Sequence, residues 1–322
     1  MTPLIKIQSL KKYFPVYAGY FSRVMGQVKA VDDVSFEIKE GETLGLVGES
    51  GCGKTTVGRM SINLITPTSG EIYINGINIL KMNSKKLKQL RPKMQIIFQD
   101  PYSSLNPRFS VEKIIGEAMM VHDLANRTNL RFKVAEIMQK VGLPSSFMSR
   151  YPHEFSGGQR QRIGIARALA LNPSYLVCDE PVSALDVSIQ AQIINLLQEL
   201  QDKENITILF ISHDLNVVKY LSHRTAVMYL GQIVETAPTE ILNKTAFHPY
   251  TKALLAANPS INRPKSNTHI PLLKGDVPSP LNPPSGCHFH TRCPEATDRC
   301  KLEQPTTLQI SKTHSVKCHL YE

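Results

Sequence analysis

The sequence lacks the features that are typical of membrane-spanning, exported and nucleic-acid-binding proteins. It contains no run of about 18 apolar residues, the length that a transmembrane helix needs. Its start, Met1–Lys6, has no basic segment followed by an apolar core, so we expect no signal peptide and a cytosolic, reducing location. We also find no nucleic-acid motif, no internal repeat and no heptad run.

Charge is the most unusual property of the composition. The 322 residues carry a formal net charge of +10. Nucleic acid, an anionic membrane face and plain solubility all fit such a charge. The densest basic run covers residues 81–93, and a solvated helix face is its favoured interpretation. The chain is long enough for one large domain and a smaller one.

A phosphate-binding loop is the strongest local motif. An apolar strand, 43–47, leads into G-x-x-x-x-G-K-T, and a helix-compatible segment follows. The loop N–H groups and the helix N-terminus would surround phosphate oxygens, while Lys54 reaches the β- and γ-phosphates and Thr55 holds Mg²⁺. We interpret Cys52 as a passive loop position. The predicted ATP-binding residues here are Gly48, Glu49, Ser50, Gly51, Cys52, Gly53, Lys54, Thr55 and Thr56.

Apolar segments alternate with helical patterns along the rest of the first 240 residues. We expect strands at 4–10 and 28–38, with a loop at 16–27 between them. Strands that are apolar on both faces and alternate with helices indicate a parallel sheet covered on both sides. The predicted strands of this kind are 94–99, 175–178 and 206–211, and the predicted helices are 111–122, 130–141, 157–171 and 187–201.

Three further groups supply chemistry for nucleotide hydrolysis. The strand 175–178 ends in Asp179 and Glu180, which we expect beside the phosphate loop as a Mg²⁺ ligand and a general base. Ser156 is a good N-cap for a second anion-binding helix start. His213 follows strand 206–211, where it would contact the γ-phosphate.

These motifs, in this order, resemble the ATP-binding cassette (ABC) subunits of membrane transporters over residues 4 to about 240. The family signature LSGGQ appears with Phe155 in place of Leu, followed by Ser156, Gly157, Gly158 and Gln159. The resemblance implies that this signature binds ATP held by a partner cassette. It also implies roles for Gln99 as a Mg²⁺ ligand, Asp186 in the D-loop, His213 as the switch histidine, and Phe14 (or Tyr13) as the aromatic that stacks on adenine.

The resemblance further implies a P-loop NTPase α/β fold with a RecA-like parallel-sheet core, an antiparallel β subdomain and a helical subdomain at about 101–170. The nucleotide-binding domain would cover 1–240. A C-terminal regulatory or Fe–S extension, 241–322, would follow, because Phe247–Leu255 and Lys274–Pro280 resemble segments of oligopeptide and dipeptide importer ATPases. Expected partners are a second, non-identical cassette, two transmembrane permeases and an extracytoplasmic binding protein, at the cytoplasmic face of the membrane.

Four of the six cysteines lie beyond residue 286, spaced C-x5-C-x6-C-x17-C. In a reducing compartment such clustering indicates a metal before a disulfide. Four thiolates suit zinc or a [4Fe–4S] cluster, and free thiols remain a third interpretation. The resemblance favours the cluster, and because the sequence shows no redox partner we expect it to staple the proline-rich tail rather than to transfer electrons. The predicted ligands are Cys287, Cys293, Cys300 and Cys318, and the nearby histidines are not expected to be ligands.

Other functions remain open at this stage. A nickel-importer ATPase would share the same architecture. A soluble cassette protein acting on nucleic acid or ribosomes is a second class, although such proteins usually carry two cassettes or a long coiled-coil insertion. A catalytically silent regulatory subunit is a third, and the presence of Glu180 and His213 argues against it.

Overall fold

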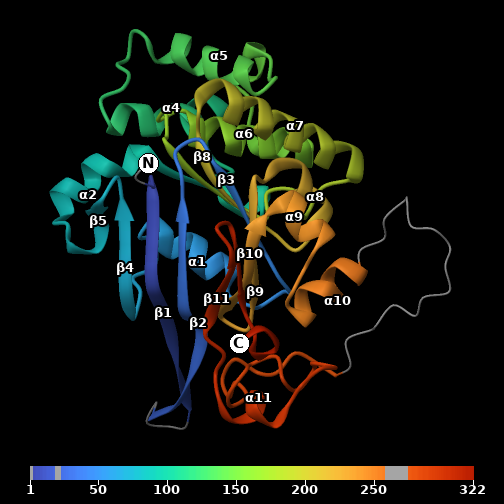
Figure 1. Cartoon of the computed structure of the whole chain (residues 1–322). Helices are drawn as coiled ribbons and strands as arrows, with labels where there is room; N and C mark the ends of the chain where they lie inside the picture. Colours follow the sequence, from blue (N-terminus) through green and yellow to red (C-terminus); the bar gives the residue numbers. More distant parts are fainter. Residues whose placement is uncertain (1–2, 19–22, 258–274) are drawn as a thin grey trace. The chain divides into compact units, whose positions relative to one another are not determined.

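The computed structural model describes residues 3–18, 23–257 and 275–322. The described part of the chain divides into two compact units. Unit 1 comprises 39–42 and 81–211, and unit 2 comprises the described residues of 3–38, 43–80 and 212–322, that is, without 19–22 and 258–274. Figure 1 shows the elements with their labels.

Unit 1 combines a parallel sheet with a group of helices. Strands β6 (Met94–Ile97), β7 (Tyr175–Asp179) and β8 (Thr207–Ser212) are parallel neighbours, with Ile97 opposite Cys178 and Asp179 opposite Ile211. Every residue of β7 and β8 is buried, which confirms the prediction made from their continuous apolar runs. The helices are α2 (Ser84–Leu90), α3 (Pro101–Ser104), α4 (Val111–Val121), α5 (Leu130–Lys140), α6 (Gly157–Leu169) and α7 (Val187–Glu204).

The sequence-based helix boundaries agree with these helices to within a few residues. Helix α7 runs three residues further than expected and stops at Asn205, whose φ of 51° is left-handed. A helix commonly ends on such a residue, and Asn tolerates that conformation better than most side chains.

Unit 2 contains an antiparallel sheet with strand order β2-β1-β4-β5. Its strands are β1 (Ile5–Ala18), β2 (Arg23–Ile38), β4 (Ser69–Ile74) and β5 (Ile77–Asn78). The expected loop at 16–27 is wrong, because β1 and β2 form one long hairpin in which Val16 lies opposite Gly26. Pairing with β4 ends at Lys11, so Pro15, which has no N–H to donate, lies where β1 has a partner on one side only.

A second set of strands in unit 2 has the order β11-β12-β10-β9-β3. Strand β3 (Thr43–Val47) is parallel to β9 (Arg224–Tyr229), and β10 (Gln232–Pro238) is antiparallel to β9. The C-terminal strands β11 (Thr307–Ser311) and β12 (His314–Lys317) extend this set, with Glu235 opposite Val316. The sequence did not predict them. The helices are α1 (Lys54–Ser61), α8 (Leu215–Leu221), α9 (Thr239–Lys244), α10 (Pro249–Ala257) and α11 (Asp298–Leu302).

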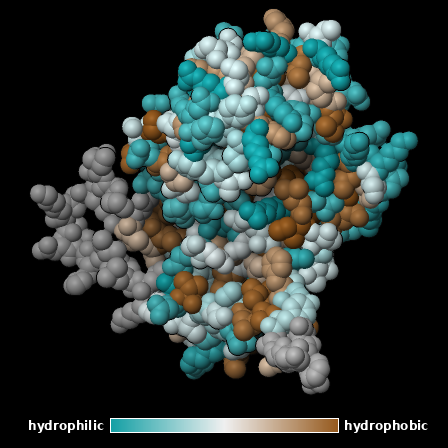
Figure 2. Space-filling view, turned by 180° about the vertical axis from the view of Figure 1, so that it is seen from behind, coloured by the Kyte–Doolittle hydropathy of each residue, from teal (hydrophilic) through white to brown (hydrophobic). Residues whose placement is uncertain are grey.

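The surface mixes apolar and polar side chains. On the face shown in Figure 2, hydrophobic residues lie in small groups among hydrophilic ones. The most exposed large apolar side chains are Val187, Leu302 and Tyr220, at 82%, 80% and 76%, and they lie on different elements. None of the helices in the described ranges is long and apolar enough to span a bilayer.

Candidate functional site

The phosphate loop of unit 2 has the conformation that its glycines predict. It connects buried strand β3 to helix α1, whose first residue is Lys54. Gly53 precedes that helix with a φ of 105°, and a Cβ there would lie 2.0 Å from the carbonyl oxygen of Ala30. A side chain at this position would meet both backbone strain and a fixed backbone atom. The loop geometry therefore requires glycine.

Lys54 is drawn back over the loop from the first turn of α1. Its ammonium donates to the carbonyl oxygens of Gly48 at 2.7 Å and Glu49 at 2.9 Å, and the residue is 4% exposed. Cys52 is also buried, and burial raises the pKa of its thiol. This thiol therefore stays protonated near neutral pH, as a passive loop position would. Thr55 and Thr56, the next two helical residues, are partly exposed.

The predicted catalytic carboxylates lie at the end of β7 in unit 1. Asp179 closes the strand and is 1% exposed. Glu180 follows with a φ of 46°, a left-handed conformation that is uncommon outside glycine. The amide nitrogen of Gln99 donates to the Glu180 carboxylate at 3.0 Å. Sequence reasoning named these two residues from separate motifs, and the fold brings them into contact.

The Ser-Gly-Gly-Gln segment caps helix α6, as predicted. The Ser156 hydroxyl accepts from the N–H of Gln159 at 3.4 Å, and the Gln159 side-chain oxygen accepts from the N–H of Ser156 at 3.1 Å. This reciprocal pair is a capping box. Phe155, which replaces the family leucine, is buried at 5% exposure and contacts Phe147 edge to face. The replacement therefore preserves an apolar anchor.

The signature packs against the residues around Asp186. A Cβ on Gly158 would lie 2.5 Å from the Ile189 side chain, and one on Gly157 would lie 3.4 Å from Leu185. Asp186 itself is exposed at the start of α7. The start of α6 and the start of α7 thus approach closely within unit 1.

Unit 2 also contains two predicted nucleotide-contacting residues that are distant from the phosphate loop in sequence, Phe14 and His213. The Phe14 ring is 37% exposed, with the Lys12 ammonium 5.1 Å from its centroid. The hydroxyl of Tyr13, by contrast, donates to Asp32 at 2.5 Å, and burial raises the pKa of that phenol. Of the two aromatics, Phe14 is therefore the ring left available for stacking. His213 is exposed beyond the end of β8.

The four C-terminal cysteines gather in unit 2. Each of the six pairs among them is close enough to interact electrostatically. Burial, followed by the other thiols, raises the pKa of Cys293 and of Cys318 to about 11, although a backbone hydrogen bond to each sulfur acts in the opposite direction. All four are free cysteines, without a disulfide. No group of three or more His, Cys, Asp or Glu side chains in the described ranges has the arrangement of a metal-binding set.

The neighbouring histidines have other partners. His314 contacts the buried carboxylate of Glu235 at 2.7 Å, and His288 contacts the Leu230 carbonyl at 3.1 Å. His319 bridges Glu322 and the Glu303 carbonyl. These contacts fix the imidazoles to the fold.

Sequence reasoning missed two residues that contact the phosphate loop. Arg292 lies between the first two clustered cysteines, Cys287 and Cys293. Its guanidinium donates two hydrogen bonds to the carboxylate of Glu49, at 2.7 and 3.0 Å. The hydroxyl of Tyr250 on α10 accepts from the N–H of Glu49 at 2.9 Å. No sequence motif links residues 243 positions apart, so only the fold reveals the first contact.

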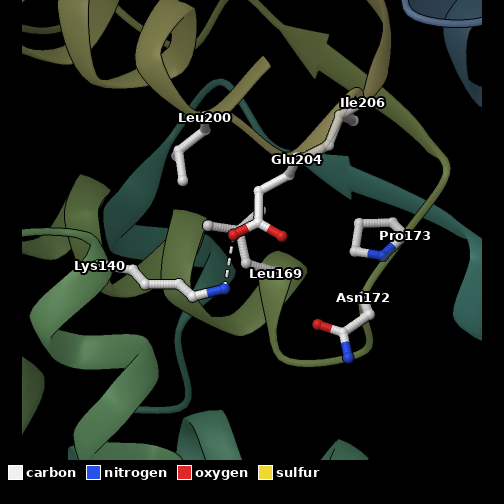
Figure 3. Close-up of a pocket in the computed structure, with 7 residues that line it drawn as sticks. All are labelled: Lys140, Leu169, Asn172, Pro173, Leu200, Glu204 and Ile206. Carbon is white, nitrogen blue, oxygen red and sulfur yellow. Dashed lines mark hydrogen bonds and ion pairs between the residues drawn. The ribbon is translucent and has the colours of Figure 1, made fainter. Parts of the chain in front are cut away.

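The pocket in Figure 3 lies elsewhere in unit 1, at the ends of α5, α6 and α7. It holds about 100 Å³, and the ion pair between Lys140 and Glu204, at 2.6 Å, crosses it. None of the predicted site residues lines this pocket. We therefore assign it no part in nucleotide chemistry.

Comparison with known proteins places this geometry in a family. Residues 31–183 match the ABC transporter family, and residues 234–300 match the oligopeptide/dipeptide transporter C-terminal region. A dimeric ATP-binding cassette, solved in a post-hydrolysis state with ADP and Pi, superposes with a TM-score of 0.65 at 28% identity, covering 73% of this chain and 98% of that one. The chain therefore belongs to the ABC family of ATPases.

Curated relatives narrow this assignment. The oligopeptide transport ATP-binding protein AppF of Bacillus subtilis is 52% identical over 321 residues, covering 99% of this chain and 97% of the relative. The dipeptide transport ATP-binding protein DppF of Haemophilus influenzae is 47% identical, covering 98% and 96%. The similarity extends through the C-terminal cysteine region, so within the family this chain groups with ATP-binding proteins of oligopeptide and dipeptide transport.

Proposed function

We propose that this chain hydrolyses ATP to power the import of dipeptides or oligopeptides across the cytoplasmic membrane. The observation that carries the proposal is the contact between Gln99 and Glu180 at the end of β7, 3.0 Å long, in a chain whose relatives along its full length are peptide-transport ATP-binding proteins. An adjacent amide and carboxylate at a strand end supply the cation ligand and the base that hydrolysis needs.

The phosphate loop binds the triphosphate in this proposal. The N–H groups from Gly48 to Thr56 surround the phosphates, and Lys54 leaves its two carbonyl partners to reach the β- and γ-phosphates. Phe14 supplies the aromatic face for adenine. These contacts position the terminal phosphate without changing its chemistry.

A hydroxyl, a carboxylate and an amide oxygen from Thr55, Asp179 and Gln99 make up the donor set for Mg²⁺. Hard oxygen ligands of this kind suit the ion, which neutralises charge on the phosphates when bound. The nitrogen end of the Gln99 amide donates to Glu180, so its oxygen end would be the ligand for a cation. The donor chemistry therefore fits magnesium.

Glu180 takes the proton of the attacking water, and His213 donates a hydrogen bond to the γ-phosphate. The donor from Gln99 holds the carboxylate in one orientation for this proton transfer. The capped start of α6, with Ser156, Gly157, Gly158 and Gln159, binds the ATP of a partner cassette, because its N–H groups form an anion site.

The remaining assembly follows from this role. We propose a second, homologous cassette as the dimer partner, two permease subunits that form the membrane path, and an extracytoplasmic binding protein that delivers the peptide. The chain then sits peripherally at the cytoplasmic face of the membrane. Division into a cassette, 1–240, and a C-terminal extension, 241–322, remains our proposal.

We further propose that Cys287, Cys293, Cys300 and Cys318 hold a [4Fe–4S] cluster, with zinc as the alternative. The support is chemical: the four thiols are free and mutually close, burial raises the pKa of Cys287, Cys293 and Cys318, and a bound cation would stabilise thiolates there. Because the thiol placements do not form a ligand set by themselves, metal analysis must decide. Anaerobic purification should give a brown protein, and a colourless one with stoichiometric zinc would favour the alternative.

Purification in mild detergent tests the transport role. We expect two permeases and a second cassette to accompany the chain, and we expect peptide with its binding protein to stimulate ATP hydrolysis in the reconstituted complex. Co-purification with RNA in place of membrane proteins would contradict the proposal. Stimulation by nickel but not by peptide would assign the cargo to the metal.

A further inference from the structure

The phosphate loop carries an acidic residue, which is unusual chemistry for an anion site. Glu49 follows Gly48 at the start of the loop, and its side chain is 25% exposed. A carboxylate a few ångströms from a triphosphate repels it, and this repulsion costs most where the surroundings are partly buried. Some feature of the fold must offset that charge.

Arg292 supplies the opposite charge from a distant part of the chain. Its guanidinium donates to both oxygens of Glu49, at 2.7 and 3.0 Å, and its side chain is 7% exposed. A bidentate pair of this kind fixes geometry as well as charge, because the planar fork matches the carboxylate. Lysine could supply the charge but not the fork.

The rest of the loop contact comes from a buried aromatic group. The Tyr250 hydroxyl accepts the Glu49 N–H at 2.9 Å, and the Tyr250 ring is fully buried. That ring contacts Tyr229 and Phe289, with centroids 4.7 and 5.4 Å apart. Phe289 and Arg292 both belong to the segment between the first two clustered cysteines, so one short segment supports the loop through charge and through packing.

We propose that the cysteine-bearing segment 287–293 is part of the ATP site, with Arg292 as a positioning residue that neutralises Glu49 and holds the phosphate loop receptive to the triphosphate. This inference rests on the proposed function, since it assumes that the loop binds ATP. It assigns the C-terminal extension a direct role in nucleotide affinity. The extension thereby does more than staple the proline-rich tail.

Repulsion by an unpaired Glu49 carboxylate grows with the number of phosphates on the nucleotide. Arg292→Met leaves the Glu49 carboxylate uncompensated, so in the purified full-length chain affinity for ATP falls about ten-fold, for ADP less and for AMP little. Isothermal titration calorimetry with each nucleotide measures these affinities. In steady-state hydrolysis by the assembled complex, KM for ATP rises while kcat changes little, because Glu180 is untouched.

Removing the acidic partner should reverse the loss. Glu49→Gln in the Arg292→Met background restores ATP affinity to within about two-fold of wild type, since neither charge remains. Glu49→Gln alone binds ATP at least as tightly as wild type. If Arg292→Met does not fold, these two variants still test the inference, and weakened ATP binding in Glu49→Gln overturns it.

Matched controls separate this inference from the proposed function. Arg299 lies in the same C-terminal region; its side chain is 52% exposed and pairs with Glu303 and Glu322. Arg299→Met therefore removes an arginine but leaves ATP affinity unchanged. Lys54→Ala abolishes tight ATP binding if the loop is the nucleotide site. Loss in Lys54→Ala with wild-type affinities in Arg292→Met overturns the inference alone. Normal ATP binding in Lys54→Ala overturns the proposed function and this inference together.

Discussion

The side-chain nitrogen of Gln99 donates to the carboxylate of Glu180 at 3.0 Å, joining a residue that follows β6 to one that follows β7. The contact spans 81 positions of sequence. The contact holds the amide and the carboxylate in fixed relative orientation. The proposed cation ligand and the proposed base would therefore depend on each other.

Glu180→Gln should retain ATP binding and lose hydrolysis. The substitution preserves size and the position of one acceptor oxygen but removes the group that takes a proton from water, so kcat falls by about 10²–10⁴-fold. Single-turnover hydrolysis and nucleotide titration measure the two effects. Turnover near the wild-type rate would remove Glu180 from the role of base.

Gln99→Glu tests the coupling of the same pair. A carboxylate in place of the amide would face Glu180 and repel it, so hydrolysis should fall more than in Gln99→Ala, which deletes the donor and the amide oxygen without adding a charge. The rate at several Mg²⁺ concentrations distinguishes loss of the cation ligand from disorder of the base. Equal rates in the two variants would show that repulsion has no effect, and wild-type rates in both would show that the contact has no catalytic consequence.

Gly53→Ala should destabilise unit 2 and abolish nucleotide binding. Its new Cβ would lie 2.0 Å from the Ala30 carbonyl oxygen at a φ of 105°, and strain of this kind lowers Tm by about 5 °C or more. Gly76→Ala is a matched control, since Gly76 also has a positive φ, 76°, but a Cβ there meets nothing within 4 Å. Thermal unfolding of both variants isolates the clash from the strain. Equal Tm losses would contradict the clash.

His248 should make the protein less stable in acid. Burial, with a smaller effect of Lys252, lowers the pKa of this imidazole from 6.5 to about 3, so the folded state keeps it neutral where the unfolded chain binds a proton. Its contribution is fully present above pH 6.5 and is lost as the pH falls toward 3. The neutral ring also caps α10, because its Nδ1 accepts the Tyr250 N–H at 3.1 Å.

His248→Asn keeps a cap acceptor without a titratable group. We expect it to have a shallower decline of unfolding free energy between pH 6.5 and 4 than wild type, measured by urea denaturation at each pH. An identical pH dependence in the two proteins would show that other groups determine acid stability.

Sequence patterns predicted the parts of the fold that depend on neighbouring residues. The glycine spacing of the phosphate loop, the buried strands β7 and β8, and the cap formed by Ser156 are all local, and the structure has each of them. The sequence did not predict the long pairing of β1 with β2, because Pro15 is typical of a strand end. A proline is tolerated there because β1 pairs with one neighbouring strand only at that position.

Long-range contacts could not be predicted in the same way. The residues neighbouring Arg292 in sequence do not indicate that Glu49 is its partner. The pairing of β12 with β10 likewise joins two strands that are distant in sequence. The clustering of the four cysteines predicted a metal site; the thiols are close enough to interact, but no metal-binding set exists among the described residues. Spacing alone could not give the positions of the thiols.

The close approach of Gly158 to Ile189 has a mechanical consequence. With so little room between the first turns of α6 and α7, neither turn can slide past the other without steric overlap. Any displacement imposed on Asp186 is therefore transmitted to the Ser-Gly-Gly-Gln tip as a nearly rigid movement. In the proposed pair of cassettes, this rigidity would couple the two nucleotide sites without a separate relay.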